Sequence, residues 1–122
     1  MRRTQFLGLG VLLLALGVCG CTSNNKGKIE GTRWTSMQGT AKGVTLPEGS
    51  VFLDFRKDGK LFGRFGTKDL TGRYELGMMN NVTFRLDQAL PNGKVHTETI
   101  VIDGNKMTMT DPDGTKLDFR KW

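Results

Sequence analysis

Few residues in this sequence are of the types that carry out chemistry. His96 is the single histidine, and Glu98 follows it two positions later. On one strand the two would share a face and could form an acid–base pair, but alternation equally allows both to face solvent, which is the interpretation we favour. One histidine cannot complete a zinc site, and it leaves the three serines without a second basic partner for a triad.

Carboxylates offer no better candidate for catalysis. Asp111-Pro112-Asp113-Gly114 is similar to the start of a calcium loop but lacks the downstream glutamate, so a hairpin turn explains it. The acids that could form a glycosidase pair alternate with apolar residues, which indicates the outer face of strands: Asp54, Glu75, Glu98 and Asp118. We therefore expect no catalytic residue, no metal and no cofactor.

Both cysteines lie at the end of a leader. A positive start with Arg2 and Arg3 precedes thirteen apolar or glycine residues, a run too short to span a bilayer. Val18-Cys19-Gly20-Cys21 resembles the cleavage region of bacterial lipoprotein signals, in which the cysteine after the cut is lipidated. We expect residues 1–20 to be removed and Cys21 to carry the lipid. The alternatives are an uncleaved amphiphilic N-terminus or an ordinary secretory signal.

Lipidation at Cys21 would leave the mature chain without a thiol, because Cys19 leaves with the leader. Two or more acyl chains anchor a protein stably to a membrane. Thr22 stands where aspartate commonly retains lipoproteins in the inner membrane, which favours the outer membrane with the protein facing the periplasm.

The residues after the leader differ in composition from the remainder. Residues 21–30 are polar and contain glycine, which is typical of a flexible tether. The full chain has a net charge of +6, and sixteen basic against twelve acidic residues remain after residue 20. Much of this excess lies near the proposed lipid, where it could help to lay the tether on the membrane or simply be solvated. A nearly neutral remainder and an exported location argue against a nucleic-acid partner.

Residues 31–122 follow a period of two, interrupted by turn residues. Val51, Leu53 and Phe55 alternate with other side chains before a turn at 57–60, and helical periodicity is not sustained anywhere. The pattern predicts an all-β domain of eight strands at roughly 32–37, 50–56, 60–65, 71–76, 81–87, 94–102, 106–110 and 115–121.

Short connections predict that each strand pairs with the next in an antiparallel meander. Closing the meander into a small barrel removes its exposed edges. The strands are short and include several aromatic residues, so we expect a mostly filled interior with a shallow mouth at best. These aromatic residues are Phe55, Phe65, Tyr74, Phe84 and Phe119.

Four segments together resemble the short lipocalin-like domains of bacterial lipoproteins: Gly31 to Trp34, Asp54 to Lys60, Gly72 to Tyr74 and Ile102 to Gly114. The resemblance covers residues 31–122. It implies an eight-stranded barrel and, in the larger members, binding of apolar ligands, whereas the function of the short members is generally unassigned.

The resemblance also bears on Trp34. Lipocalins usually place glycine and tryptophan two apart and cover the tryptophan with an arginine near the last strand, whereas Gly31 and Trp34 are three apart. Arg120 could supply a cation–π contact at the barrel end, although alternation puts it on the face opposite Phe119. Trp34 is then either part of a Trp34–Arg120 plug or an ordinary core residue.

Together these features predict a non-enzymatic, membrane-anchored envelope lipoprotein. Its barrel would bind a small apolar ligand or an envelope partner. One alternative is a periplasmic inhibitor of lysozyme, although a positive net charge would repel that basic enzyme. A purely structural envelope protein is another alternative.

Overall fold

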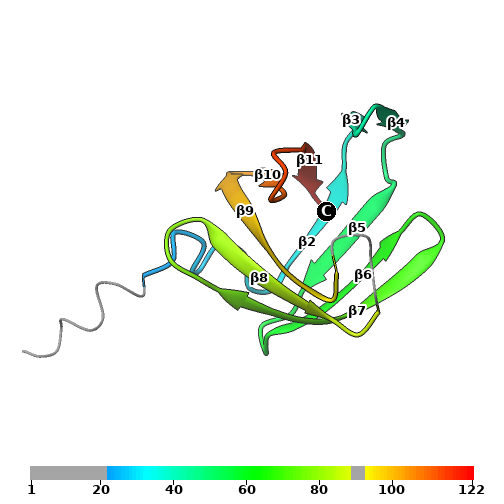
Figure 1. Ribbon diagram of the computed structural model, residues 1–122. Helices are drawn as coiled ribbons and strands as arrows, with labels where there is room; N and C mark the ends of the chain where they lie inside the picture. Colours follow the sequence, from blue (N-terminus) through cyan, green and yellow to red (C-terminus); the bar gives the residue numbers. More distant parts are fainter. Residues whose placement is uncertain (1–21, 89–92) are drawn as a thin grey trace, which may run out of the picture.

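The computed structural model describes residues 22–88 and 93–122, which form strands, turns and loops without a helix (Figure 1). Among these residues there is accordingly no helix long and apolar enough to cross a membrane. Eight strands build the barrel: β2 (Thr32–Ser36), β5 (Val51–Phe55), β6 (Lys60–Phe65), β7 (Lys68–Leu76), β8 (Asn81–Leu86), β9 (Val95–Asp103), β10 (Lys106–Thr110) and β11 (Lys116–Lys121). The two short strands β3 (Gly39–Ala41) and β4 (Val44–Leu46) form a separate hairpin.

The eight strands form a closed antiparallel barrel in the order β10-β11-β2-β5-β6-β7-β8-β9. The seam is the pairing of β11 with β2, in which Phe119 opposes Ser36 and Lys121 opposes Trp34. Every barrel strand therefore has a partner on both sides, so no edge is left unpaired. The predicted all-β meander and its closure are confirmed.

Turn residues at the predicted places join the strands. Gly59, between β5 and β6, has a φ of 87°, a conformation that glycine adopts without a side-chain penalty. The turn between β10 and β11 is closed by the Gly114 amide, which donates to the Asp111 carbonyl over 2.9 Å. This confirms that residues 111–114 form a hairpin turn.

β7 pairs with β6 along its first part and with β8 along its second part. The overlap falls at Gly72, which opposes Leu61 of β6 and Leu86 of β8. A Cβ atom at Gly72 would lie 2.3 Å from the Arg85 carbonyl oxygen and 2.8 Å from the Leu86 Cα. Only glycine allows the backbones to approach this closely.

The two ends of the barrel differ in packing. At the closed end, marked by the turns at 57–59, 77–80 and 104–105, inward side chains fill the interior, as period-two alternation requires. Phe55 and Tyr74 meet edge to face there with ring centroids 5.1 Å apart. The open end carries the β3–β4 hairpin and the turns at 66–67 and 111–114. Fully buried residues of the closed end are Ile29, Trp34, Phe55, Val82, Ile100 and Met107.

Residues 22–30 belong to the folded domain and cover part of the closed end. Ile29 is fully buried in the core, and the buried Asn25 side chain donates to the Ile100 carbonyl over 3.1 Å. Ser23 forms a parallel β-bridge with Met79. The expectation of a flexible tether is thus wrong for these residues, because Ile29 supplies an apolar anchor and Asn25 satisfies a buried backbone acceptor.

Candidate functional site

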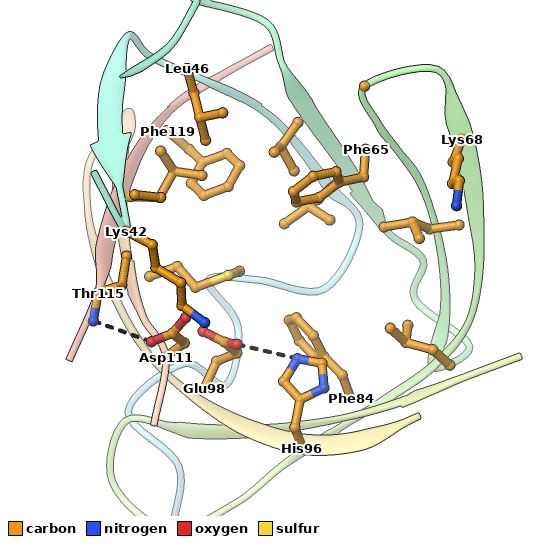
Figure 2. A pocket seen from close by; sticks show the side chains of 18 of the residues that line it. Lys42, Leu46, Phe65, Lys68, Phe84, His96, Glu98, Asp111, Thr115 and Phe119 are labelled. Atoms are coloured by element: carbon orange, nitrogen blue, oxygen red, sulfur yellow. Dashed lines mark hydrogen bonds and ion pairs between the residues drawn. The ribbon is translucent and has the colours of Figure 1, made fainter. Parts of the chain in front are cut away.

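A cavity of about 740 Å³ occupies the open half of the barrel (Figure 2). Its walls come from the inward faces of the barrel strands, and the β3–β4 hairpin and the β6–β7 turn border its mouth. The volume falls within the range of about 300–1,000 Å³ typical of small-molecule sites. The apolar part of the wall includes Val51, Leu53, Leu61, Leu70, Phe84, Leu86, Met109, Leu117 and Phe119.

The cavity contradicts the prediction of a mostly filled interior. Phe55 and Tyr74 lie in the core of the closed end, and Phe65 is half exposed at the mouth. Phe84 and Phe119 lie in the cavity wall, so these aromatic side chains border the open half without filling it. Aliphatic residues line much of the open half, and they leave its centre empty.

His96 and Glu98 form the polar centre of the cavity wall. His96 Nε2 lies 3.2 Å from Glu98 Oε2, and their side chains are only 9% and 5% exposed. The prediction that both face solvent is wrong. Residues 96, 98 and 100 of one strand share a face, and Ile100 is fully buried, so β9 turns all three inward. The sequence held a signal for this orientation, because the apolar Ile100 lies two and four positions after Glu98 and His96 and therefore shares their strand face.

Burial favours the uncharged form of both groups. The pKa of His96 is lowered by desolvation, against the smaller opposing effects of the Gly93 backbone and the Asp111 charge. Desolvation, helped by the charges of Asp111 and Asp113, raises the pKa of Glu98 to about 7. His96 Nδ1 is buried and has no hydrogen-bond partner among the residues that the structure describes. The pair therefore offers hydrogen-bonding capacity, and Glu98 carries its full negative charge only above about pH 7.

Charged groups lie on both sides of the cavity mouth. Figure 2 shows Lys42, Asp111 and Glu98 on one side of the cavity, with Phe65 and Lys68 across from them. Lys42 Nζ lies 3.2 Å from Asp113 Oδ2, which links the β3–β4 hairpin to the β10–β11 turn. Both side chains of this pair are about half exposed, so it contributes little stability.

The other predicted carboxylates lie apart from the cavity. Asp54 accepts a hydrogen bond from Arg56 Nε over 2.8 Å, and Glu75 pairs with Arg85 over 3.1 Å. Asp118 accepts from the Thr108 hydroxyl over 2.8 Å. These three acids interact with neighbouring side chains; Glu75 and Asp118 are exposed or half exposed, whereas Asp54 is buried beside Arg56. Among the described ranges, no group of three or more His, Cys, Asp or Glu residues is placed to hold a metal ion.

Trp34 is fully buried at the closed end, and its indole N–H donates to the Thr32 hydroxyl over 2.8 Å. The cation over its ring is Lys121, whose Nζ lies 5.9 Å from the ring centroid. Arg120 pairs instead with Glu48. The predicted Trp34–Arg120 plug is thus corrected: Lys121 opposes Trp34 in the β2–β11 register, and strand alternation turns Arg120 outward.

Cys21, the predicted lipidation site, and the leader before it lie outside the described residues. Thr22, the first described residue, accepts a hydrogen bond from the Met79 amide over 3.2 Å. The chain therefore joins the folded domain directly after Cys21.

No protein-family model matches the sequence, and a search of curated proteins finds no match. Among solved structures, the chain is similar to the crystal structure of an uncharacterized protein from Bacteroides eggerthii. The two are 18% identical with a TM-score of 0.58, over 75% of this chain and 98% of that chain. This likeness supports the fold alone, so the resemblance to lipocalin-like domains stays a prediction.

Proposed function

We propose that the protein is a non-enzymatic envelope lipoprotein that binds a small, mainly apolar molecule inside its barrel. The observation that carries this proposal is the 740 Å³ cavity in the open half. An empty apolar cavity lowers the stability of a protein, because the side chains of its wall lack van der Waals contacts on one side. A barrel without a ligand would therefore be more stable if larger side chains filled this space. A ligand would cover the exposed wall and recover these contacts.

The polar side of the cavity favours a ligand with one polar group. Glu98 and His96 lie among apolar walls, and a hydrogen bond from a ligand hydroxyl or amide to Glu98 would orient the apolar body toward Leu70 and Leu86. Above about pH 7 the ionised Glu98, together with the charges of Asp111 and Asp113, would disfavour an anionic group at this depth. The ligand class is therefore an uncharged molecule that is mainly apolar.

The anchor in this proposal is a lipid on Cys21. The support for it is the leader of residues 1–20, the small residue before Cys21, and Thr22 in place of an aspartate. Two or more acyl chains would hold the barrel at the outer membrane, facing the periplasm. Mass spectrometry of the detergent-extracted protein should show an acylated N-terminal Cys21, and Cys21→Ala should release the protein from membranes.

Titration with phenylnaphthylamine, an uncharged dye that fluoresces in apolar surroundings, tests ligand binding. We expect saturable binding with one site per barrel. Leu70→Trp places a larger side chain into the cavity wall and should weaken binding by about tenfold or more, or about 1.4 kcal/mol.

Val101→Trp is the matched control, because Val101 lies on the outer face of β9 and is 48% exposed. It should leave the dye affinity unchanged. Binding that is absent in the unsubstituted protein, or lost equally in both variants, would overturn the proposed ligand site.

A further inference from the structure

Two exposed methionines form the tip of the β7–β8 turn at the closed end. Met78 and Met79 are 56% and 66% exposed. Met79 also has a φ of 56°, a left-handed conformation that asparagine or glycine adopts with less strain. The turn thus places apolar side chains in solvent at a position where its backbone would favour a small or polar residue.

This methionine turn is held against the first residues after Cys21. The Met79 amide donates to the Thr22 carbonyl over 3.2 Å, and the Asn24 amide donates to the Met79 carbonyl over 2.8 Å. If Cys21 carries the lipid, the acyl chains are attached next to Thr22, which is hydrogen-bonded to this turn. Lys26 and Lys28 are exposed in the same segment, where anionic headgroups would attract them.

The methionine turn and the cavity mouth lie at opposite ends of the barrel. β7 begins with Lys68 at the mouth and ends with Leu76, just before Met78. A strand of nine residues spans about 25 Å at about 3.3 Å per residue. A surface that contacts the methionine turn is therefore far from the mouth.

We propose that Met78 and Met79 insert into the lipid bilayer and seat the barrel on its closed end, so that the cavity mouth faces away from the membrane. Ligand would then enter and leave on the side opposite the bilayer that holds the anchor. The inference rests on the proposed lipidation of Cys21. It adds an orientation that an acyl anchor alone does not impose.

Depth-dependent quenching tests this orientation with the acylated full-length protein in vesicles of phosphatidylethanolamine and phosphatidylglycerol. Met79→Cys and Val44→Cys each supply one thiol for an environment-sensitive dye, since an acylated Cys21 has none. Val44 is the matched position, because it is 58% exposed in the hairpin at the mouth. Lipids with a nitroxide quencher should quench the dye at position 79 severalfold more than the dye at position 44.

A second variant separates the membrane contact from folding. Met79→Asn suits the left-handed backbone, so its thermal stability should be unchanged or higher. Combined with Met78→Asp in the acylated protein, it should release the barrel from its fixed orientation and raise quenching of the dye at position 44. Val101→Asn on the outer barrel wall should leave that quenching unchanged.

The outcomes distinguish the two proposals. An unmodified Cys21 in the purified membrane protein overturns the anchor and this orientation together. An acylated Cys21 with equal quenching at positions 79 and 44, or stronger quenching at 44, overturns the orientation alone and leaves the anchor and the ligand site standing.

Discussion

Glu98 shows how one inward position determines the chemistry of the cavity. Its carboxyl group lies 3.2 Å from His96 in an apolar wall, and burial raises its pKa to about 7. In the unfolded chain the same group would titrate near 4.5. Folding therefore holds a proton on Glu98 between these two values, which links both stability and ligand choice to pH.

Glu98→Gln should stabilise the protein more at pH 8 than at pH 5. The stability of the unsubstituted protein falls as pH rises from about 4.5 to about 7, because the unfolded state then loses a proton that the folded state retains. Glutamine removes this loss. Allowing for screening in the open cavity, we expect a gain of about 1–2 kcal/mol at pH 8 relative to pH 5, measured by urea unfolding.

Glu75→Gln is the control for this measurement. Glu75 is exposed and pairs with Arg85, so its replacement should change stability by less than about 1 kcal/mol at either pH. An effect of Glu98→Gln that is the same at pH 5 and pH 8 would contradict the buried carboxyl.

The charge of Glu98 should also select against anionic ligands above pH 7. Anilinonaphthalene sulfonate and phenylnaphthylamine share a ring system and differ in the sulfonate, which stays ionised. The sulfonate dye should bind about threefold to tenfold more tightly at pH 6 than at pH 8, because protonation removes the repelling carboxylate. The uncharged dye should show no such difference in fluorescence titrations.

Glu98→Gln should remove most of the pH dependence for the sulfonate dye. If the variant retains the full dependence, groups at the mouth such as Asp111 determine the charge selection in place of Glu98.

Among the structural elements, the segment of residues 22–30 departs most from expectation. Its sequence is polar apart from Ile29, so no apolar period marks it as part of the fold. Its placement depends on the barrel: Asn25 bonds to the Ile100 carbonyl, and Ile29 fills the closed end. Such a segment acquires its structure from contacts that are distant in sequence.

Ile29→Ala should destabilise the domain by about 2–4 kcal/mol, because a fully buried isoleucine leaves a cavity that the strands cannot close. Chemical denaturation measures the loss. Val101→Ala on the outer face should cost less than about 0.5 kcal/mol. A near-neutral Ile29→Ala would mean that the segment is a tether after all.

The strands themselves were the most predictable elements. The ranges 60–65 and 106–110 match the observed strands, and most of the other boundaries differ by one residue. β7 is the exception, since it begins at Lys68 rather than 71. The β3–β4 hairpin was not predicted, because its three-residue strands are too short to show alternation.

At the scale of the whole molecule, the cavity could not be predicted from strand patterns. Alternation tells which side chains point inward, but the empty volume depends on how far along the barrel each large side chain lies. Phe55 and Tyr74 both fall at the closed end, whereas Val51 and Leu70, on the same two strands, line the cavity of the open end. The interaction between the charges of Asp111 and Glu98 could not be predicted either, because the pairing of β9 with β10 brings these two residues together.

Ligand binding should raise the melting temperature of the whole barrel. At a free ligand concentration one hundred times the Kd, the stabilisation is about 2.7 kcal/mol, which corresponds to roughly 10 °C or more for a domain of this size. Phenylnaphthylamine should produce this shift, measured by circular dichroism. Leu70→Trp should show a much smaller shift at the same concentration, and an equal shift in both proteins would place the dye outside the cavity.

The seam between β2 and β11 has a consequence for how the chain matures. Because Trp34 pairs with Leu53 on one side and with Lys121 on the other, the cylinder cannot close until the last strand has left the ribosome. Until then β2 lacks one neighbour, and native contacts between distant segments form slowly. The closed barrel, and with it the complete cavity wall that Leu117 and Phe119 of β11 supply, therefore forms only after β11 has been synthesised.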